Sequence, residues 1–155
     1  MDTGQYGRIR PDIIGYVNGL PLLFVELKKY HKGLKKAYTD NFVRYRTYAP
    51  HLFHHNAIVM LANGDTGKFG TLSSPYAYFN EWTRLDEEES GRVDFETMLR
   101  GVCDKTTLLD LVENFILFDR SKGDEDGMQA TRKIIARNHQ FLGVNRAFGA
   151  VQARD

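Results

Sequence analysis

A short apolar run over 22–28 constrains the fold more than any other part of the chain, because a carboxylate interrupts it. The run reads Leu-Leu-Phe-Val-Glu-Leu-Lys, which is apolar on both faces, as in a buried strand. A buried carboxylate without a partner is costly, so Glu26 requires a nearby cation. The sequence therefore predicts a buried strand that ends at a charged site.

A second strand precedes this run, and the two are expected to form a hairpin. The Asn-Gly pair at 18–19 is typical of a two-residue turn between antiparallel strands. Counting back from that turn sets Asp12 opposite Val25 and diagonal to Glu26. Alternation along the strand places Glu26 and Lys28 on one face. Two carboxylates and a lysine are thus expected to converge.

Asp12, Glu26 and Lys28 are candidate catalytic residues. The carboxylates can hold a hard divalent cation such as Mg²⁺ through their oxygens, leaving sites for water and a phosphate oxygen. The lysine can orient or deprotonate the attacking water, or stabilise the charge that develops on phosphorus. Such a site suits phosphodiester hydrolysis. The plainer alternative is an ion pair at the end of the strand, between Glu26 and Lys28 or Lys29, with Asp12 merely opening the first strand.

The sequence resembles the nuclease domain of the restriction (R) subunit of type I restriction-modification enzymes in two stretches, RPDIIGYVNGLPLLFVELKK and LFHHNAIVMLANGDTGKFGTLSSPYAYFNEW. The resemblance implies an α/β fold, with a mixed β-sheet flanked by helices, of the PD-(D/E)xK restriction-endonuclease kind. Asp12, Glu26 and Lys28 match its three catalytic positions, with Asp12 and Glu26 as metal ligands. It further implies Mg²⁺ as cofactor, double-stranded DNA as substrate, and the modification and specificity subunits as partners.

A basic segment follows the candidate catalytic lysine directly. Its side chains are candidate contacts for DNA phosphates, which would make binding sensitive to salt and blind to sequence. The residues are Lys29, Lys32, Lys35 and Lys36. The alternative is a solvated loop and helix start.

A helix is predicted over 35–48, before Pro50 makes its continuation unfavourable. Asn41 and Tyr45 stand four apart and therefore share a helix face. The resembled family has a glutamine and a tyrosine at this spacing, a motif thought to assist DNA cleavage or binding. Asn41 is one methylene shorter than glutamine, and its amide could bond a phosphate or an active-site water. The alternative is an exposed Asn41 and a packed Tyr45.

The remainder of the chain is expected to complete one domain and begin another. We predict a nuclease-like domain over 1–118 that lacks N-terminal elements, a charged linker over 119–127, and a helical segment over 128–155 that leads into an absent motor domain. Within the first domain we expect strands over 57–62 and 68–72 and helices over 94–100 and 106–118. Members of the resembled family are several-fold longer, so we expect this chain to be a fragment.

The last segment resembles the stretch that precedes the first ATP-binding motif of the family's translocases. By that resemblance, Gln140 would help to read adenine in the full-length protein. No Walker A sequence follows it, so ATP is expected only in the full-length protein. An apolar stripe would normally pack on the motor domain. Its members are Ile134, Phe141, Val144 and Phe148.

Composition supports one domain and an intracellular setting. The 155 residues, 42% hydrophobic, suffice for a sizeable core. The net charge of +1 requires any DNA contact to come from a local patch. The chain has a single cysteine, Cys103, and no apolar run that could span a bilayer or act as a signal peptide. We expect a cytoplasmic protein without a membrane partner.

These features predict a metal-dependent DNA endonuclease module of a type I restriction subunit, cutting foreign double-stranded DNA after ATP-driven translocation by the full-length protein. A second interpretation is a non-cleaving DNA-binding or interaction module of the same complex, inert on its own. A third is a stand-alone nuclease, against which the helicase-like tail argues.

Overall fold

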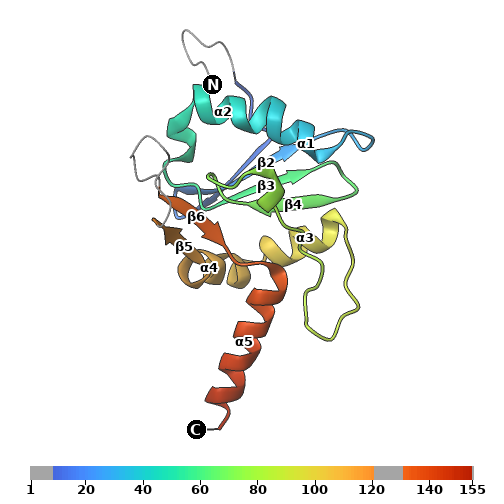
Figure 1. Cartoon of the computed structure of the whole chain (residues 1–155), viewed down its shortest axis with the longest axis vertical. Coiled ribbons are helices and arrows are strands. Elements are labelled where there is room, and N and C mark those ends of the chain that lie inside the picture. The colour runs from blue at the N-terminus through green and yellow to red at the C-terminus, as the bar shows by residue number, and fades with distance from the viewer. Residues whose placement is uncertain (1–8, 121–130, 155) are drawn as a thin grey trace.

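The computed structural model describes residues 9–120 and 131–154 and has an α/β fold built on a mixed four-stranded sheet (Figure 1). The strand order is β1-β2-β3-β4, with β2 and β3 parallel and both outer pairs antiparallel. The strands are β1 (Ile13–Val17), β2 (Leu20–Leu27), β3 (Ile58–Ala62) and β4 (Gly67–Gly70). The predicted mixed sheet with flanking helices is therefore confirmed.

The predicted turn between β1 and β2 is present, but the register of the hairpin differs from simple counting. Asn18 and Gly19 both have positive φ, 49° and 81°, as a tight hairpin turn requires. A bulge beside Gly15 leaves Leu22 without a partner, because Tyr16 pairs with Pro21 while Gly15 pairs with Leu23. Beyond the bulge Ile13 pairs with Val25, so the prediction of Asp12 opposite Val25 is wrong by one residue.

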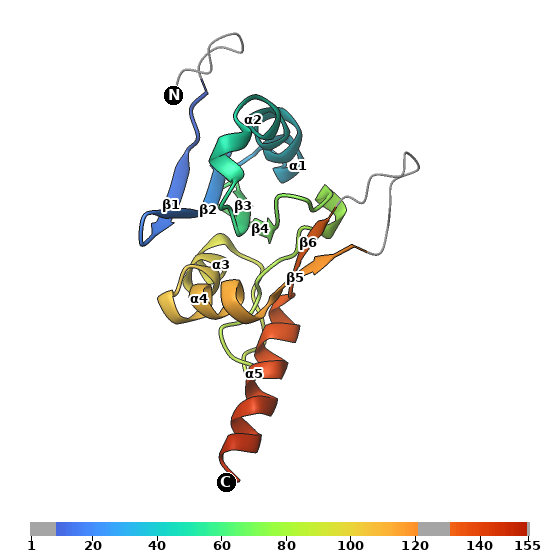
Figure 2. The same cartoon turned by 90° about the vertical axis from the view of Figure 1, so that its left-hand side faces the viewer.

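One face of the sheet is covered by a continuous helical stretch that follows β2 (Figure 2). The stretch consists of α1 (Leu34–Lys36), the π-helical η2 (Ala37–Phe42) and α2 (Val43–Tyr48), and it is followed by the 3-10 turn η3 (Pro50–Phe53). Buried aromatic rings of this stretch and of η3 pack on Phe24 of β2, with ring centroids 5.0–6.1 Å apart. The helix predicted over 35–48 is confirmed, and η2 adds one wide turn at its centre.

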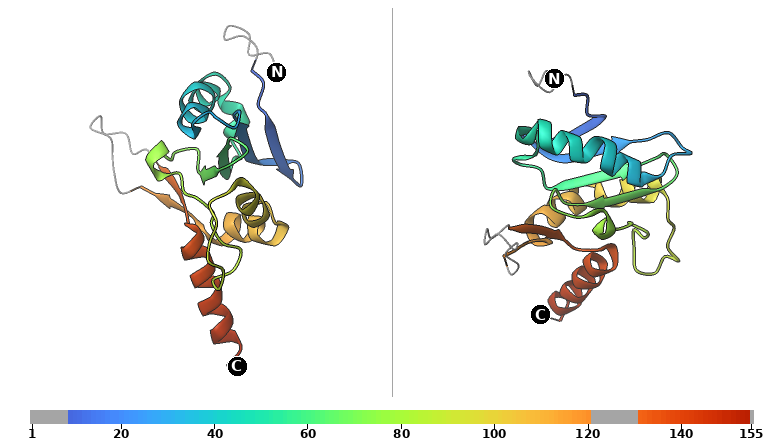
Figure 3. Two further views of the ribbon diagram at one scale, coloured as in Figure 1. Left: turned by 90° about the vertical axis from the view of Figure 1, so that its right-hand side faces the viewer. Right: turned by 45° about the horizontal axis from the view of Figure 1, so that its top comes forward.

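The other face carries α3 (Phe95–Val102) and α4 (Lys105–Asn114), which lie across the sheet from α2 in Figures 2 and 3. Asp94 and Asp104 cap the two helices by accepting hydrogen bonds from the backbone amides three residues on. Between β4 and α3 the chain forms the short 3-10 turn η4 (Tyr76–Tyr78) and then buries Trp82. Of the aromatic residues over 76–82, Phe79 and Trp82 thus belong to the core, whereas Tyr78 is exposed.

The predicted end of the chain needs two corrections. The helix predicted over 106–118 ends at Asn114, because the apolar residues after it form β5 (Ile116–Asp119). The single helix predicted over 128–155 is also wrong, since β6 (Arg132–Ile135) pairs with β5 before α5 (Asn138–Gln152) begins. Runs of four residues rich in Ile, Leu and Phe are too short for periodicity to separate strand from helix.

The predicted linker over 119–127 lies largely outside the described residues. Asp119 belongs to β5, and the connection between the two strands of the hairpin includes the rest of the predicted linker. Ile135 and Phe141, from the predicted tail, pack in the same core cluster as Leu23 and Trp82. The division of the chain into domains stays a prediction.

Helix α5 leaves the body of the molecule and ends at the far tip of the described chain (Figure 1). Of the predicted apolar stripe, Phe141 is buried against Trp82 and Phe115, while Val144 and Phe148 are 55% and 61% exposed. Among the described residues, α5 and the other helices are too short or too polar to cross a bilayer.

Candidate active site

Glu26 is the buried charge of the sheet, with only 1% of its surface exposed. It lies one residue before the end of β2, where it pairs in register with Leu61 of β3. Strand alternation sends its side chain to the same face as Phe24, toward the helical stretch that contains η2. The predicted burial of this carboxylate is confirmed.

Two donors meet one oxygen of this carboxylate. The Lys28 Nζ lies 3.1 Å from Glu26 Oε1, and the Asn41 Nδ2, which η2 presents to the sheet, donates to the same oxygen. The other oxygen, Glu26 Oε2, is buried and accepts no hydrogen bond from the residues that the structure describes. A buried acceptor of this kind is available to a water molecule or a cation.

Asp12 lies at the same end of β2 as Glu26, and the bulge in β2 determines which face it occupies. It precedes β1 by one residue, and continuation of the observed register sets it against Glu26 rather than Val25. Directly opposed residues of an antiparallel pair share a face, so the bulge turns Asp12 toward the Glu26 side. The Leu27 backbone amide donates to Asp12 Oδ2 over 2.8 Å, which fixes the carboxylate at the end of β2. Asp12 itself is exposed.

The electrostatics of the site centre on Glu26. Burial raises the pKa of the Glu26 carboxyl most, and the charge of Asp12 raises it further. The hydrogen bonds from Lys28 and Asn41 lower the same pKa but do not offset the burial. The carboxylate therefore gains from any additional cation that approaches its open oxygen.

Tyr45 lies on the same side of the sheet, but its hydroxyl bonds a backbone carbonyl. Its ring is buried and packs edge-on to Phe24, and its hydroxyl donates to the Arg10 carbonyl over 2.9 Å. This bond holds the chain just ahead of Asp12. Asn41 and Tyr45 thus share a helix face, as predicted; the first contacts Glu26 and the second holds the strand that delivers Asp12.

The predicted DNA-contacting lysines are exposed and lie in the connection between β2 and α1 and on α1 itself. The four are Lys29, Lys32, Lys35 and Lys36. The Lys28 backbone amide donates to Ala62 at the end of β3, and Asn63 donates to the Lys32 carbonyl. These bonds fix the connection at the end of β2 and β3, where Glu26 lies.

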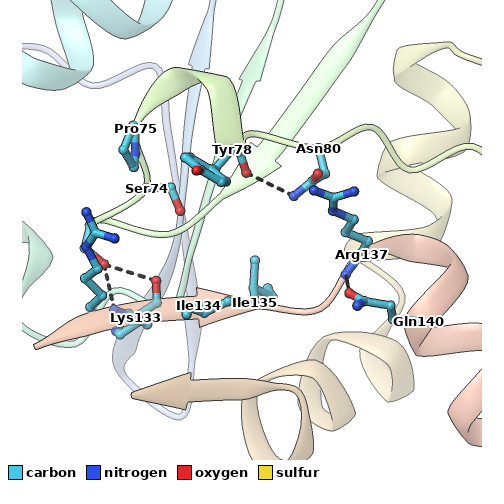
Figure 4. Close-up of a pocket in the computed structure, with 11 residues that line it drawn as sticks. Ser74, Pro75, Tyr78, Asn80, Lys133, Ile134, Ile135, Arg137 and Gln140 are labelled. Atoms are coloured by element: carbon cyan, nitrogen blue, oxygen red, sulfur yellow. Dashed lines mark hydrogen bonds between the residues drawn. The ribbon is translucent and has the colours of Figure 1, made fainter. Parts of the chain in front are cut away.

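Gln140 is remote from these residues. Its side-chain oxygen accepts a hydrogen bond from the Arg137 backbone amide over 2.9 Å at the start of α5. It also lines a cleft beside β6, shown in Figure 4. The adenine-reading role of Gln140 stays a prediction.

Sequence reasoning missed two features of the site. Simple counting overlooked the bulge, although Pro21 next to the turn is a signal for one, because proline cannot donate to a regular ladder. The contact between Asn41 and Glu26 depends on the π-helical turn, which no pattern in the sequence predicts.

Comparison with known proteins bears on which family this site belongs to. A family model described as "Type I restriction enzyme R protein N terminus" matches residues 3–78, which contain every residue of the site. The type I restriction enzyme HindI endonuclease subunit of Haemophilus influenzae is 36% identical over 149 residues, covering 91% of this chain. The chain belongs to the type I restriction R-protein N-terminal family. A more distant relative, described provisionally as the type I restriction enzyme MjaIXP endonuclease subunit of Methanocaldococcus jannaschii, is 24% identical over 165 residues and 92% of this chain.

This R-protein N-terminal chain spans a small part of those relatives. It covers 14% of the length of the HindI subunit and 15% of the MjaIXP subunit. What the complete relatives do therefore belongs to proposals about this chain.

Proposed function

We propose that this R-protein N-terminal chain is a metal-dependent DNA endonuclease module with a PD-(D/E)xK arrangement where β1 begins and β2 ends. The observation that carries the proposal is the open, buried oxygen Glu26 Oε2 beside Asp12 and Lys28. A carboxylate buried for structural reasons alone normally has both oxygens hydrogen-bonded.

The residues present suit a hard divalent cation such as Mg²⁺. Asp12 and Glu26 would supply carboxylate oxygens, and one oxygen of Glu26 is free of donors among the described residues. When bound, such a cation supplies a polarised phosphate and an activated water. The described part of the chain holds no group of three or more His, Cys, Asp or Glu side chains that could hold a metal ion, so water and phosphate oxygens would complete the coordination.

The protein side chains would then act as follows. Lys28, tied to Glu26 but 17% exposed, would face the phosphate and stabilise the charge that develops on it. Asn41 would hold Glu26 in place, and Tyr45 would hold the Arg10 carbonyl and so position Asp12. The exposed lysines of the β2–α1 connection would bind duplex phosphates without regard to sequence.

A second candidate function has an observation of its own. Glu26 Oε1 already receives Lys28 and Asn41, and burial raises the pKa of the carboxyl, both of which resist metal binding. A chain that never binds metal would be a non-cleaving DNA-binding or interaction module of the restriction complex, with the modification and specificity subunits and the ATP-driven motor supplied by the complete assembly.

Cleavage separates the two candidates. We expect the 155-residue chain to nick supercoiled plasmid in Mg²⁺ and not in EDTA. Lys28→Gln should slow nicking about a hundredfold, the loss typical of removing one preorganised charge-stabilising donor. Lys105→Gln, on the opposite side of the sheet, is the matched control and should leave the rate unchanged. Metal-independent retention of duplex DNA without nicking would favour the non-cleaving module.

A further inference from the structure

A cleft separate from the Glu26 site lies between η4 and the β5–β6 hairpin. Its volume is about 340 Å³. Figure 4 shows Tyr78 on the η4 side, Ile134 and Ile135 on the β6 side, and Arg137 at one end. Lys133 of β6 donates to the Asn56 carbonyl at the start of β3, whereas Glu26 lies at the end of β2. Since β2 and β3 are parallel, the cleft lies near the start of these strands and the candidate active site lies at their end.

The charge of the cleft is positive. Arg132, Lys133 and Arg137 line it, and no carboxylate stands among its lining residues in the described part of the chain. Arg132 and Arg137 are exposed and form none of the ion pairs between described side chains. Asp119 is the register partner of Arg132 in the hairpin and is the nearest acidic neighbour along the sheet. Exposed guanidinium groups outside these ion pairs are suited to binding phosphate.

Two facing walls of the cleft carry an aromatic and an aliphatic residue. Tyr78 is 63% exposed and Ile134 is 46% exposed, although Phe79 and Trp82, which follow Tyr78 in sequence, are buried. An exposed tyrosine opposite an aliphatic side chain is a platform for a planar ring. The ligand therefore combines an anionic group with a planar body, as a nucleotide does.

The polar side chains around the platform are already engaged with the protein. Ser74 Oγ bonds Thr71, the Asn80 amide donates to the Tyr78 carbonyl, and the Gln140 side-chain oxygen accepts from the Arg137 backbone amide. These groups leave few directed donors to read the edge of a base. We expect the platform to accept any base.

The exposure of the walls distinguishes a free nucleotide from a nucleotide that is part of a strand. A pocket for a free small molecule usually buries about 70–90% of its ligand. Walls as exposed as Tyr78 and Ile134 cover one side of a base, which suits one unit of a strand that is also held elsewhere. We propose that this cleft binds an unpaired nucleotide of a single DNA strand, with its base on Tyr78 and its phosphate on Arg132 and Arg137. The choice of DNA as the strand rests on the proposed function, whereas nucleotide binding rests on the cleft itself.

The test is fluorescence anisotropy of the complete chain with a labelled single-stranded dT12 oligonucleotide in EDTA. Tyr78→Leu and Arg132→Gln should each weaken binding about tenfold, the loss expected for one base stack or one charged phosphate contact. Tyr16→Leu, an equally exposed tyrosine on β1 across the sheet from β4, and Arg100→Gln, an exposed arginine of α3, are the matched controls and should bind as the parent chain does.

Other results would overturn the inference. They are undetectable binding of dT12 by the parent chain, equal affinity of the parent and both cleft variants, or weakening by Tyr16→Leu in place of Tyr78→Leu. Free ATP that binds the cleft more tightly than dT12 would also overturn the assignment to a DNA strand. Binding of dT12 is measured in EDTA and nicking of plasmid in Mg²⁺, so failure of this inference and failure of the nuclease proposal are read separately.

Discussion

Glu26 concentrates the electrostatic cost of the site in one side chain. The strand around it is apolar because it crosses the core, and the carboxylate is tolerated there because Lys28 and Asn41 donate to one of its oxygens. The second oxygen has no such donor among the described residues. A cation at this oxygen would compensate the burial of the charge.

The stability of the chain should depend on pH through this residue. Because the pKa of Glu26 is raised in the folded state, the folded protein holds a proton in a pH interval where the unfolded chain has lost it. The free energy of unfolding should therefore fall as pH rises from the ordinary glutamate pKa through the raised one. Denaturant unfolding of Glu26→Gln across that interval should give a flatter profile than the parent.

Glu96→Gln is the control for this measurement, since Glu96 is an exposed glutamate paired with Arg100 on α3. It should keep the slope of the parent chain. An unchanged slope in Glu26→Gln would show that this carboxyl has an ordinary pKa in the folded protein.

Asn41 tunes the same group. Its hydrogen bond to Glu26 lowers the pKa of the carboxyl, so Asn41→Ala should raise that pKa further. Asn41→Gln retains an amide donor and should give a value close to the parent's. Carboxyl carbon NMR titration measures both, and an Ala variant that titrates with the parent would contradict the contact.

The hairpin of β1 and β2 illustrates what sequence can and cannot establish. Its strands and turn follow from the apolar run and the Asn-Gly pair, and both are present. Its register does not follow, because the bulge at Leu22 is a local choice between two pairings that the turn alone leaves open. The extra residue, Leu22, determines whether Asp12 faces Glu26. The predicted set of site residues therefore depended on a register that simple counting placed one residue away.

The helices were predictable where periodicity was long and failed where it was short. The stretch 35–48 is confirmed, whereas β5 and β6 were both predicted as parts of helices. Each strand has four residues and exists because its partner strand is present. This pairing joins two short segments across the connection between them, which a pattern within either segment does not report.

Packing of α3 against Trp82 leaves no room for a larger residue at one position. A Cβ added to Gly101 would lie 2.0 Å from Trp82 Nε1, so helix and ring must be in close contact. Gly101→Ala should lower the free energy of unfolding by about 1–3 kcal/mol, the usual cost of overpacking. Gly149→Ala, on α5 where a Cβ meets nothing within 4 Å, is the control and should leave it unchanged or raise it by up to about 1 kcal/mol. Chemical denaturation compares the two, and equal stabilities would contradict this packing.

The complete chain is nearly neutral, so its affinity for DNA must come from local charge. The exposed lysines of the β2–α1 connection sit beside the candidate active site. Replacing each lysine that contacts phosphate by glutamine should reduce the slope of log affinity against log salt by about 0.9 for duplex DNA. Binding of a short duplex in EDTA at several salt concentrations measures this slope. Lys105→Gln should not alter it, and an unchanged slope in a Lys29→Gln, Lys32→Gln double variant would place the DNA elsewhere.

Magnesium binding decides whether Asp12 and Glu26 form a metal site. Isothermal titration calorimetry of the complete chain, at a pH above the raised pKa of Glu26, should give saturable binding of Mg²⁺. Glu26→Gln should abolish it, Asp12→Asn should weaken it strongly, and Glu96→Gln should match the parent. Binding that survives in Glu26→Gln, or no binding to the parent chain, would contradict a metal site at the end of β2.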